Sequence, residues 1–375
     1  MKLFEYQAKE IFAEQGIAVP RGIVADSPGA ARRAAEEIGV PCMVKSQLLR
    51  GGRGKLGLVR RAASAEEAER LTAEFMASEY GVRKVLVEAC ADIDQEVYLS
   101  ISIEPVSAKA MVMLCASGGV EIEELARTSP EKILKGYISL EQGPTGEELD
   151  ELLDKAGFSG AVKARLSGLI GGLYRVFRRY DAELAEINPV FITREQTVVA
   201  GDGKLIIDDN SMFRQPRFEK TREYYASDME FEAAKQGIPY IQFDGDISLM
   251  CAGAGLTTTV YDLINYEGGK VANYLEFGGP HYTKAETAMR ICLENSSSVI
   301  LIVTFGTIAR ADVIAEGIVK ACEKLHPDRP LVTCIRGTNE EAAHAALKAA
   351  GIECVTDTEE AVRRAVAYAK EAKNR

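Results

Sequence analysis

The second half of the chain alternates short, nearly continuous apolar runs with longer amphipathic segments. The apolar runs predict strands at residues 246–252, 270–277, 298–305, 330–335 and 352–355. The amphipathic segments have helical spacing and fall at residues 257–267, 283–295, 312–325, 339–350 and 358–373. Strands and helices in strict alternation predict a parallel sheet that helices cover on both faces.

The first half alternates less regularly. Strands are predicted at residues 41–45, 56–62, 84–90, 96–104, 107–117, 185–193 and 197–208, and helices at residues 27–38, 64–80 and 146–180. The polar, aromatic stretch at residues 214–236 separates the two patterns. We therefore predict two domains, at residues 1–225 and 236–375.

Composition narrows the class of protein. A net charge of -11 argues against a nucleic-acid binder, which normally presents a basic face. The chain has no long apolar run and its start, MKLFEYQAKEIF, has no secretory or transit pattern, so we expect a cytoplasmic protein. Eight scattered cysteines without a CxxC are typical of buried free thiols in a reducing compartment. Three distant histidines argue against a zinc site or a Cys/His nucleophile pair.

A glycine-rich basic loop, SQLLRGGRGKLGLV at residues 46–59, directly follows the apolar run PCMVK. Its cations are Arg50, Arg53 and Lys55. Glycines allow positive φ and the close approach of a ligand, and the cations suit phosphate. An ordinary solvated hairpin turn fits the same residues, because the spacing is neither GxxxxGK[ST] nor GxGxxG.

Polar residues interrupt the apolar context of several strands in the first half. They are Glu88, Glu96, Glu186, Asn188 and Asp202. A buried carboxylate is unfavourable unless it is paired or bound to a cation, so these residues indicate a site. Lys45, at the end of PCMVK, would neutralise phosphate, and Glu88 and Glu96 would accept hydrogen bonds from a base or ribose. Asn188 and Asp202 would supply hard oxygen ligands to Mg²⁺.

Two predicted strands of the second half end in glycine turns that lead into helices. The first turn, CAGAGLTTTV, contains Gly253 and Gly255, and the second is FGTIARAD at residues 305–312. In a doubly wound sheet, ligands bind beyond the carboxyl ends of strands, where the N–H groups of a helix start receive anions. The alternative is that these glycines only make tight turns. A third loop, FGGPHYTK, contains His281 and Tyr282, for which a plain surface position is the simpler interpretation.

Several motifs resemble the beta subunit of succinyl-CoA synthetase, in the same order and spacing over nearly the whole chain. They are LFEYQAKEIFAEQGIAVPRG, VKSQLLRGGRGK, LVEACADIDQEVYL, SGGVEIEELA, EINPVFIT, DGKLIIDDNSMFRQP, GAGLTTTVYDLI and FGTIARADVIAEGI. The resemblance implies an α/β chain with an N-terminal ATP-grasp fold. A flavodoxin-like, doubly wound parallel-sheet CoA-ligase domain would follow it.

The resemblance also implies roles for individual residues. The implied nucleotide-binding positions are Lys45, Gly52, Arg53, Gly54, Glu88, Ala91 and Glu96. The implied Mg²⁺ ligands are Asn188 and Asp202, and the implied catalytic residues are Lys45 and Glu186, the latter near a phosphohistidine. The implied substrate or phosphate positions, at the two glycine turns, are Ala252, Gly253, Ala254, Gly255, Thr307, Ile308 and Ala309.

The reaction of the family explains why no residue here looks like a catalytic histidine. Its enzymes transfer a phosphoryl group from ATP or GTP to a histidine of an alpha subunit, which passes it to the acid. CoA then displaces phosphate from the acyl phosphate. The resemblance implies an alpha-subunit partner that carries most of the CoA site, in a heterodimer or a heterotetramer. It leaves ATP and GTP both open, because the two forms share the phosphate and metal groups.

The chain departs from the family pattern where the acid binds. Succinate enzymes usually have Asn-Gly-Ala-Gly at the first turn, where Ala252 here replaces the asparagine. Thr307 replaces the second glycine of Phe-Gly-Gly-Ile at the second turn. The first change removes a side-chain donor and acceptor, and the second adds a hydroxyl. Together they predict a small acid other than succinate, such as malate, citrate, a short monocarboxylate or sulfoacetate. Neutral drift around succinate is the alternative.

Two other functions fit parts of the sequence. A stand-alone ATP-grasp ligase that joins a carboxylate to an amine explains the first domain but leaves the second unused. A non-catalytic binding or regulatory subunit has no reason to keep the nucleotide and metal residues together. We therefore expect one half of a nucleoside-diphosphate-forming carboxylate–CoA ligase.

Overall fold

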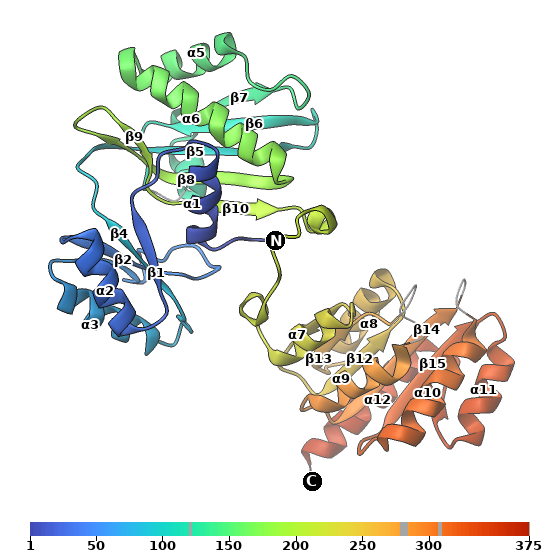
Figure 1. The fold of residues 1–375 in the computed structure, drawn as a ribbon. Coiled ribbons are helices and arrows are strands. Elements are labelled where there is room, and N and C mark those ends of the chain that lie inside the picture. The colour runs from blue at the N-terminus through green and yellow to red at the C-terminus, as the bar shows by residue number, and fades with distance from the viewer. Residues whose placement is uncertain (120–121, 278–283, 307–309, 375) are drawn as a thin grey trace. The chain divides into compact units, whose positions relative to one another are not determined.

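The chain divides into two compact units, Met1–Glu219 and Lys220–Arg375. Figure 1 draws them in colours that run from blue to red along the chain. The computed structural model describes residues 1–119, 122–277, 284–306 and 310–374. In this described part, no helix combines the length and apolar character that crossing a membrane requires. The predicted positions that lie outside the described residues are His281, Tyr282, Thr307, Ile308 and Ala309.

A four-stranded antiparallel sheet, in the order β1-β4-β2-β3, lies in the first unit. Its strands are β1 (Gly22–Ala25), β2 (Cys42–Ser46), β3 (Val59–Ala62) and β4 (Val85–Ala89). Helices α2 (Pro28–Ile38) and α3 (Ala65–Met76) pack on one face of this sheet (Figure 1). They begin at Ser27 and Ser64, whose side chains cap free N–H groups of the first turn. The glycine-rich loop joins β2 to β3.

A larger antiparallel sheet completes the first unit, in the order β10-β8-β5-β6-β7 with β9 paired to β8. Its strands are β5 (Ile93–Glu104), β6 (Lys109–Cys115), β7 (Leu134–Ile138), β8 (Ala182–Thr193), β9 (Val198–Ala200) and β10 (Lys204–Ile207). The connecting helices are α4 (Ile122–Thr128), η1 (Pro130–Lys132), α5 (Gly146–Lys155) and α6 (Gly160–Arg179). Of these, α6 buries its apolar side against β5, β8 and β9.

The N-terminal segment runs along the edge of this larger sheet. The Leu3 N–H donates to the Leu205 carbonyl of β10 at 2.8 Å. Helix α1 (Glu5–Glu14) follows at once and packs against α6 and β10. In its first turn the Tyr6 N–H donates to Gln47 Oε1 at 3.1 Å. The start of α1 therefore lies beside the end of β2, where the glycine-rich loop begins.

The second unit contains a six-stranded sheet in the order β11-β13-β12-β14-β15-β16. Its strands are β11 (Tyr240–Gln242), β12 (Ile247–Cys251), β13 (Val271–Leu275), β14 (Val299–Gly306), β15 (Leu331–Gly337) and β16 (Glu353–Cys354). All neighbours pair in parallel except β11 and β13. Without that antiparallel edge strand, the order is the 2-1-3-4-5 of flavodoxin-like folds, with β12 as its first strand. The predicted parallel sheet is confirmed.

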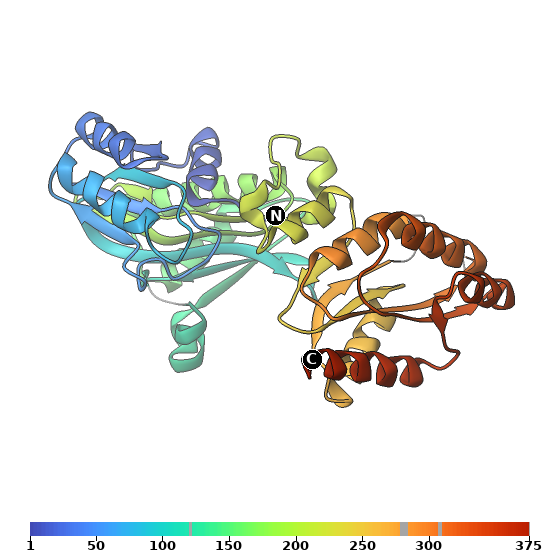
Figure 2. The ribbon, with the colours of Figure 1, turned by 90° about the horizontal axis from the view of Figure 1, so that it is seen from below.

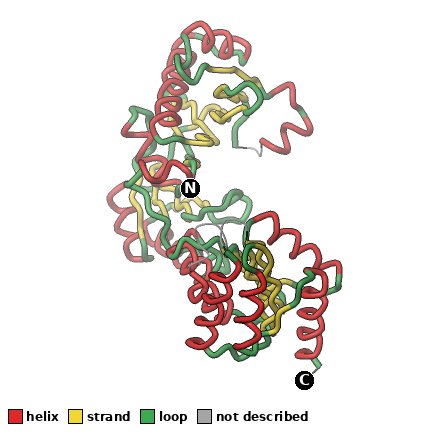
Figure 3. Tube along the Cα trace, turned by 90° about the vertical axis from the view of Figure 1, so that its right-hand side faces the viewer, coloured by secondary structure: helices red, strands yellow, loops and turns green. Residues whose placement is uncertain are grey.

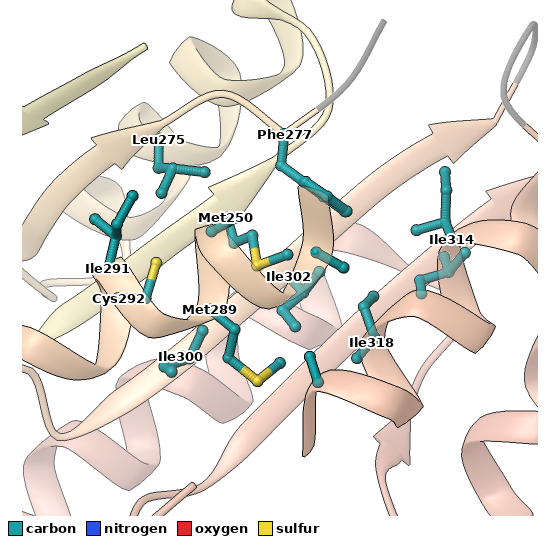
Figure 4. Close-up of a cluster of buried hydrophobic side chains, with 14 of the residues drawn as sticks. Met250, Leu275, Phe277, Met289, Ile291, Cys292, Ile300, Ile302, Ile314 and Ile318 are labelled. Carbon is teal, nitrogen blue, oxygen red and sulfur yellow. The ribbon is translucent and has the colours of Figure 1, made fainter. Parts of the chain in front are cut away.

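Helices cover both faces of this sheet, as Figures 2 and 3 show. On one face lie α8 (Ala254–Tyr266) and α12 (Thr358–Lys373). On the other lie α7 (Asp228–Lys235), α9 (Ala285–Glu294), α10 (Ala311–Leu325) and α11 (Glu340–Ala349). Because successive side chains of a strand point to opposite faces, β14 contributes to two cores. Ile300 and Ile302 pack with Met289 of α9 and Ile318 of α10 (Figure 4), whereas Leu301 faces α8 and α12.

The two units divide between Glu219 and Lys220, within the polar stretch at residues 214–236 that separates the two sequence patterns. The short turns η2 (Asp209–Arg214) and η3 (Arg222–Tyr224) flank this division, and residues 228–235 form α7 and belong to the second unit. Two contacts explain why this polar stretch is ordered. Ala233 is fully buried in the core of the second unit, and Glu230 Oε1 accepts the Gln242 N–H of β11 at 3.1 Å.

Candidate active site

A cavity of about 800 Å³ lies within the first unit, between the glycine-rich loop and the strands β8 and β10. It is lined by ten of the predicted site residues, Lys45, Gly52, Arg53, Gly54, Glu88, Ala91, Glu96, Glu186, Asn188 and Asp202. They come from both sheets and from the turns that connect the strands. The fold therefore brings together residues that the sequence placed in one site from separate segments.

The glycine-rich loop turns back on itself between β2 and β3. The Gly57 N–H donates to the Gly54 carbonyl at 3.0 Å, and the Leu58 N–H donates to the Arg53 carbonyl at 3.0 Å. Gly52 has a φ of 74°, which favours glycine. No atom lies within 4 Å of the point where a Cβ would stand on Gly52 or Gly54. Open backbone beside the cavity favours phosphate binding over an ordinary hairpin turn.

A buried cluster of ion pairs borders the cavity. Lys45 Nζ lies 3.1 Å from Glu5 Oε1 and 2.6 Å from Glu88 Oε2. Lys9 Nζ lies 3.0 Å from Glu5 Oε1 and 2.5 Å from Glu88 Oε1. Arg53 Nη1 approaches the other oxygen of Glu5 at 2.6 Å. Each charge in this cluster is therefore compensated by direct contact with an opposite one.

The charges of this cluster control the protonation of its members. Burial by itself would raise the pKa of Glu5, but the three cations around it hold that pKa well below its usual range. Burial would lower the pKa of Lys45, but Glu5 and Glu88 raise it, so the ammonium stays charged. Because an unpaired buried charge is strongly destabilising, each member depends on the others.

Replacing Glu5 by glutamine should lower the free energy of unfolding by about 3 kcal/mol near neutral pH, since buried cations lose their counter-charge. The pKa of Glu5 falls when the protein folds, from an ordinary value of 4.5 in the unfolded chain. The ionised carboxylate therefore stabilises the folded state at pH values above about 4.5. That contribution is lost as the pH falls through the lower folded value. The difference between wild type and Glu5→Gln should therefore shrink as the pH is lowered below about 4.5. Denaturant unfolding across this range measures it.

Glu10 offers a matched control on the same helix. Its side chain is exposed and lies 3.5 Å from Arg217. Glu10→Gln should change the free energy of unfolding by less than about 0.5 kcal/mol at any of these pH values. If Glu5→Gln behaved like Glu10→Gln, the ion cluster would not stabilise the fold.

Asn188 and Asp202 bring an amide oxygen and a carboxylate to the same cavity. Asn188 lies on β8 and its Oδ1 accepts the Gly119 N–H at 2.9 Å. Asp202 lies in the turn between β9 and β10. The Gly201 N–H donates to the Pro189 carbonyl at 2.9 Å, which ties this turn to the strand that carries Asn188.

This donor set, an amide oxygen and a carboxylate, suits a hard divalent cation such as Mg²⁺. Among the residues that the structure describes, no three His, Cys, Asp or Glu side chains are placed to hold a metal together. Mg²⁺ usually takes only one or two protein carboxylates and completes its shell with phosphate oxygens and water. Burial and the neighbouring Glu5 raise the pKa of Asp202, against the opposing effect of Arg53. Asn188 and Asp202 therefore suit a Mg²⁺ ion that binds together with a phosphate chain.

Glu186 faces the cavity from β8. The Tyr98 hydroxyl donates to its Oε2 at 3.2 Å, and Lys204 Nζ lies 3.8 Å from its Oε1. Burial is the main reason why the pKa of Glu186 is raised, and Lys204 opposes that shift. Such a carboxyl group can accept a hydrogen bond from a ring N–H of a histidine, which is compatible with its predicted place near a phosphohistidine.

The segment from β4 to β5 brings Glu88 and Glu96 to the cavity. The carboxylate of Glu88, which we expect to contact a base or ribose, is also paired with Lys9 and Lys45. Glu96 lines the cavity, and a Cβ on Gly119 would come within 2.3 Å of its Oε2. Position 119 also has a φ of 70°, so it requires glycine.

The predicted acid site follows two neighbouring parallel strands of the second unit. Residues 252–255 follow β12, and residues 307–309, outside the described residues, follow β14. Gly253 has a φ of 87° and precedes α8, and the space where a Cβ of Gly255 would stand is open. These strands are the first and third of the 2-1-3-4-5 order, so their ends flank the switch point where such sheets bind ligands.

Close backbone packing joins the ends of β14 and β15. Gly337 has a φ of 116°, and a Cβ on it would stand 2.0 Å from the carbonyl oxygen of Gly306. The Thr338 N–H donates to the same carbonyl oxygen at 3.0 Å. A glycine of the next strand therefore sets the position of the last residue before the second predicted turn.

Three charged residues near these sites, Glu5, Lys9 and Arg310, were not predicted from the sequence. Glu5 and Lys9 stand four residues apart on α1, a spacing that is equally typical of an exposed helix face. Arg310 immediately precedes α10 and its Nε lies 3.1 Å from Asp312 Oδ1. Its cation follows directly on residues 307–309, where an anionic acid is expected.

Two family comparisons match the two parts of the chain. The ATP-grasp domain family matches residues 2–192, and the CoA-ligase family matches residues 250–368. The predicted order of an ATP-grasp domain followed by a CoA-ligase domain is confirmed. The match to the CoA-ligase family argues against a stand-alone ligase of carboxylates and amines, because such an enzyme would not use a CoA-ligase domain.

Individual proteins extend this similarity to the full length. The chain is 55% identical over 366 residues to the ADP-forming sulfoacetate-CoA ligase subunit SauC of Bilophila wadsworthia, covering 98% of each. It is 39% identical over 377 residues to the beta subunit of ADP-forming succinate–CoA ligase of Ignicoccus hospitalis, covering 99% of this chain and 100% of that one.

A solved structure shares the fold. ATP citrate lyase from Methanothrix soehngenii, in complex with citrate and coenzyme A, aligns with a TM-score of 0.75 and 21% identity, over 98% of this chain and 99% of that one. The two family matches and the full-length relatives point to the same family. The cavity, lined by the residues predicted to bind a nucleotide, is compatible with it. The chain belongs to the family of ADP-forming CoA-ligase beta subunits, in which an ATP-grasp domain precedes a CoA-ligase domain.

Proposed function

We propose that this chain is the beta subunit of an ADP-forming ligase that joins sulfoacetate to CoA. The observation that carries the proposal is the single cavity in which the open glycine loop, Lys45 and Arg53 meet the oxygen donors Asn188 and Asp202. This set is what phosphoryl transfer from a nucleotide requires, because catalysis there is mostly positioning and charge stabilisation.

Each group has a distinct task in this proposal. The backbone of the loop, with Arg53 and Lys45, holds the phosphates of ATP. Asn188 and Asp202 would hold Mg²⁺, which would supply positive charge beside the phosphates. The names of the relatives describe them as ADP-forming, and we therefore propose ATP rather than GTP as the nucleotide of this chain.

A partner must supply the histidine that accepts the phosphoryl group. Of the two described histidines, His326 ends α10 in a left-handed conformation and His344 Nε2 lies 2.7 Å from the Ile335 carbonyl oxygen. Neither of them lines the cavity. We propose that an alpha subunit brings its histidine to Glu186, which orients the ring, and adds most of the CoA site.

We infer the acid from the residues at the two glycine turns of the second unit and from the sequence identity to two named relatives. The full-length identity is 55% to the sulfoacetate relative and 39% to the succinate relative. A sulfonate is tetrahedral and carries three acceptor oxygens, whereas the second carboxylate of succinate is planar and carries two. Ala252, in place of an asparagine, leaves more room, and the hydroxyl of Thr307 adds a donor.

A substrate screen tests the proposal. The chain is co-purified with an alpha subunit, and CoA-dependent ADP release is followed with sulfoacetate, succinate, malate, citrate, acetate and propionate. We expect kcat/KM for sulfoacetate to exceed that for succinate by at least about tenfold, which is about 1.4 kcal/mol of transition-state binding. A preference for succinate would make the chain an ordinary succinate enzyme subunit.

The double reversion Ala252→Asn, Thr307→Gly tests the two positions directly. It should move the preference toward succinate by about tenfold, because the asparagine can again pair with a carboxylate. Ala350→Asn, at the exposed end of α11, is the control and should leave the preference unchanged. An unchanged preference in the double variant would place the specificity elsewhere in the site.

A further inference from the structure

The side chain of Arg53, which belongs to the glycine-rich loop, contacts Asp202 in the turn between β9 and β10. It therefore connects the segment proposed to bind phosphate with the segment proposed to bind Mg²⁺. Its Nη2 lies 3.1 Å from Asp202 Oδ1 and 3.0 Å from Oδ2, so it faces both oxygens of that carboxylate. Its Nη1 donates to Glu5 at 2.6 Å and to the Ser46 carbonyl at 2.8 Å. The guanidinium group is largely buried, with 10% of the side chain exposed.

A metal ion at Asp202 and this contact need the same carboxylate. Mg²⁺ requires oxygen ligands at about 2.0–2.1 Å in near-octahedral geometry. A guanidinium that faces both carboxylate oxygens blocks these directions and adds a second positive charge beside the ion. The two cations therefore compete for Asp202.

We propose that Arg53 makes metal binding conditional on the nucleotide, because phosphate oxygens must draw Arg53 away from Asp202 before Mg²⁺ can take its place. This inference rests on the proposed function, since it assumes that a nucleotide phosphate binds at the glycine-rich loop. It adds an order of events: the nucleotide phosphates engage Arg53 first, and the metal then binds at Asp202, so the metal does not bind tightly alone.

Arg53 is better suited to this exchange than Lys45. Lys45 is fixed by Glu5, by Glu88 and by the Gly201 carbonyl, to which it donates at 2.7 Å. Arg53 stands between Gly52 and Gly54, whose Cβ positions are open, whereas Lys45 is held in strand β2. Glu5 keeps two lysine partners when Arg53 moves, so the buried cluster stays compensated.

Binding of Mn²⁺, a substitute for Mg²⁺ that is visible by electron paramagnetic resonance, tests the exchange without any turnover. The full-length chain is titrated with Mn²⁺ alone and again with saturating ADP. In the wild type, ADP should tighten Mn²⁺ binding at least about tenfold, because the two ligands share one coupling free energy. Arg53→Gln should bind Mn²⁺ alone at least about fivefold more tightly than the wild type and should lose most of the tightening by ADP.

Two further variants control this result. Arg60, on β3, donates to the Gly57 carbonyl of the same loop at 2.8 Å and does not line the cavity. Arg60→Gln removes one positive charge near the loop and should bind Mn²⁺ as the wild type does. Arg53→Lys keeps the charge, and with it the balance of the cluster, but a single ammonium cannot bind Glu5 and Asp202 through separate groups. It should bind Mn²⁺ alone about two- to threefold more tightly than the wild type.

The outcomes separate this inference from the proposed function. If the wild type binds ADP and neither Arg53 variant changes the affinity for Mn²⁺ alone, the contact with Asp202 does not gate the metal and the inference fails. If the wild type does not bind ADP in calorimetry, the proposed function fails, and the inference fails with it. Arg53→Lys decides the question if thermal melts show that Arg53→Gln does not fold.

Discussion

Asp202→Asn should reduce the rate of acyl-CoA formation by about 10³-fold, equivalent to about 4 kcal/mol of transition-state stabilisation. The substitution keeps the size of the side chain but removes its charge, so the proposed Mg²⁺ site would retain only neutral protein oxygens. The loss should be greatest at limiting Mg²⁺ and smaller when Mg²⁺ is raised. ADP release from the complex with an alpha subunit, in the presence of acid and CoA, measures the rate.

Asp208 provides the control for this variant. It lies just after β10, accepts the Asn210 N–H at 2.8 Å and does not line the cavity. Asp208→Asn should keep the rate within about twofold of the wild type, as surface substitutions usually do. If Asp202→Asn retained more than a tenth of the wild-type rate at every Mg²⁺ concentration, Asp202 would not be a metal ligand.

Glu186→Gln should slow phosphorylation of the alpha-subunit histidine by about 10³-fold, within the range expected for loss of a positioned acid–base group. Nucleotide binding should change by less than about threefold, because the proposed phosphate and metal contacts come from other residues. A single-turnover assay with labelled ATP measures the phosphorylation step, and calorimetry with ADP measures binding.

Glu183 serves as the reference for Glu186, because it lies on the same strand but is exposed and does not line the cavity. Glu183→Gln should phosphorylate the alpha subunit at the wild-type rate. A joint loss of nucleotide affinity and phosphorylation in Glu186→Gln would instead assign Glu186 to nucleotide binding.

The second unit was largely predictable because its strands are buried on both faces. Residues 299–306, VILIVTFG, form a nearly continuous apolar run, and this pattern belongs to parallel strands under two helix layers. The order of the strands and the antiparallel edge strand β11 were not predictable in the same way. They depend on pairing between segments that lie far apart in the sequence, which no local pattern records.

The candidate site was predictable where polar residues interrupt an apolar strand, as Glu186 and Asn188 do on β8. It was not predictable where a charge is buried only by tertiary structure. Glu5 and Lys9 belong to an amphipathic helix, and they are buried because α1 packs against α6 and β10. The pairing of Glu88 with Lys9 follows from the same placement.

The packing of Gly337 on Gly306 limits which positions can vary when the acid preference changes. A side chain at 337 would force Gly306, at the end of β14, to move, and position 307 follows it directly in the sequence. Directed evolution for new acids should therefore accept diversity at 252 and 307 but return glycine at 337 in every active clone. Position 337 would then show the selection profile of a substrate contact, although its role is to hold the neighbouring strand in place.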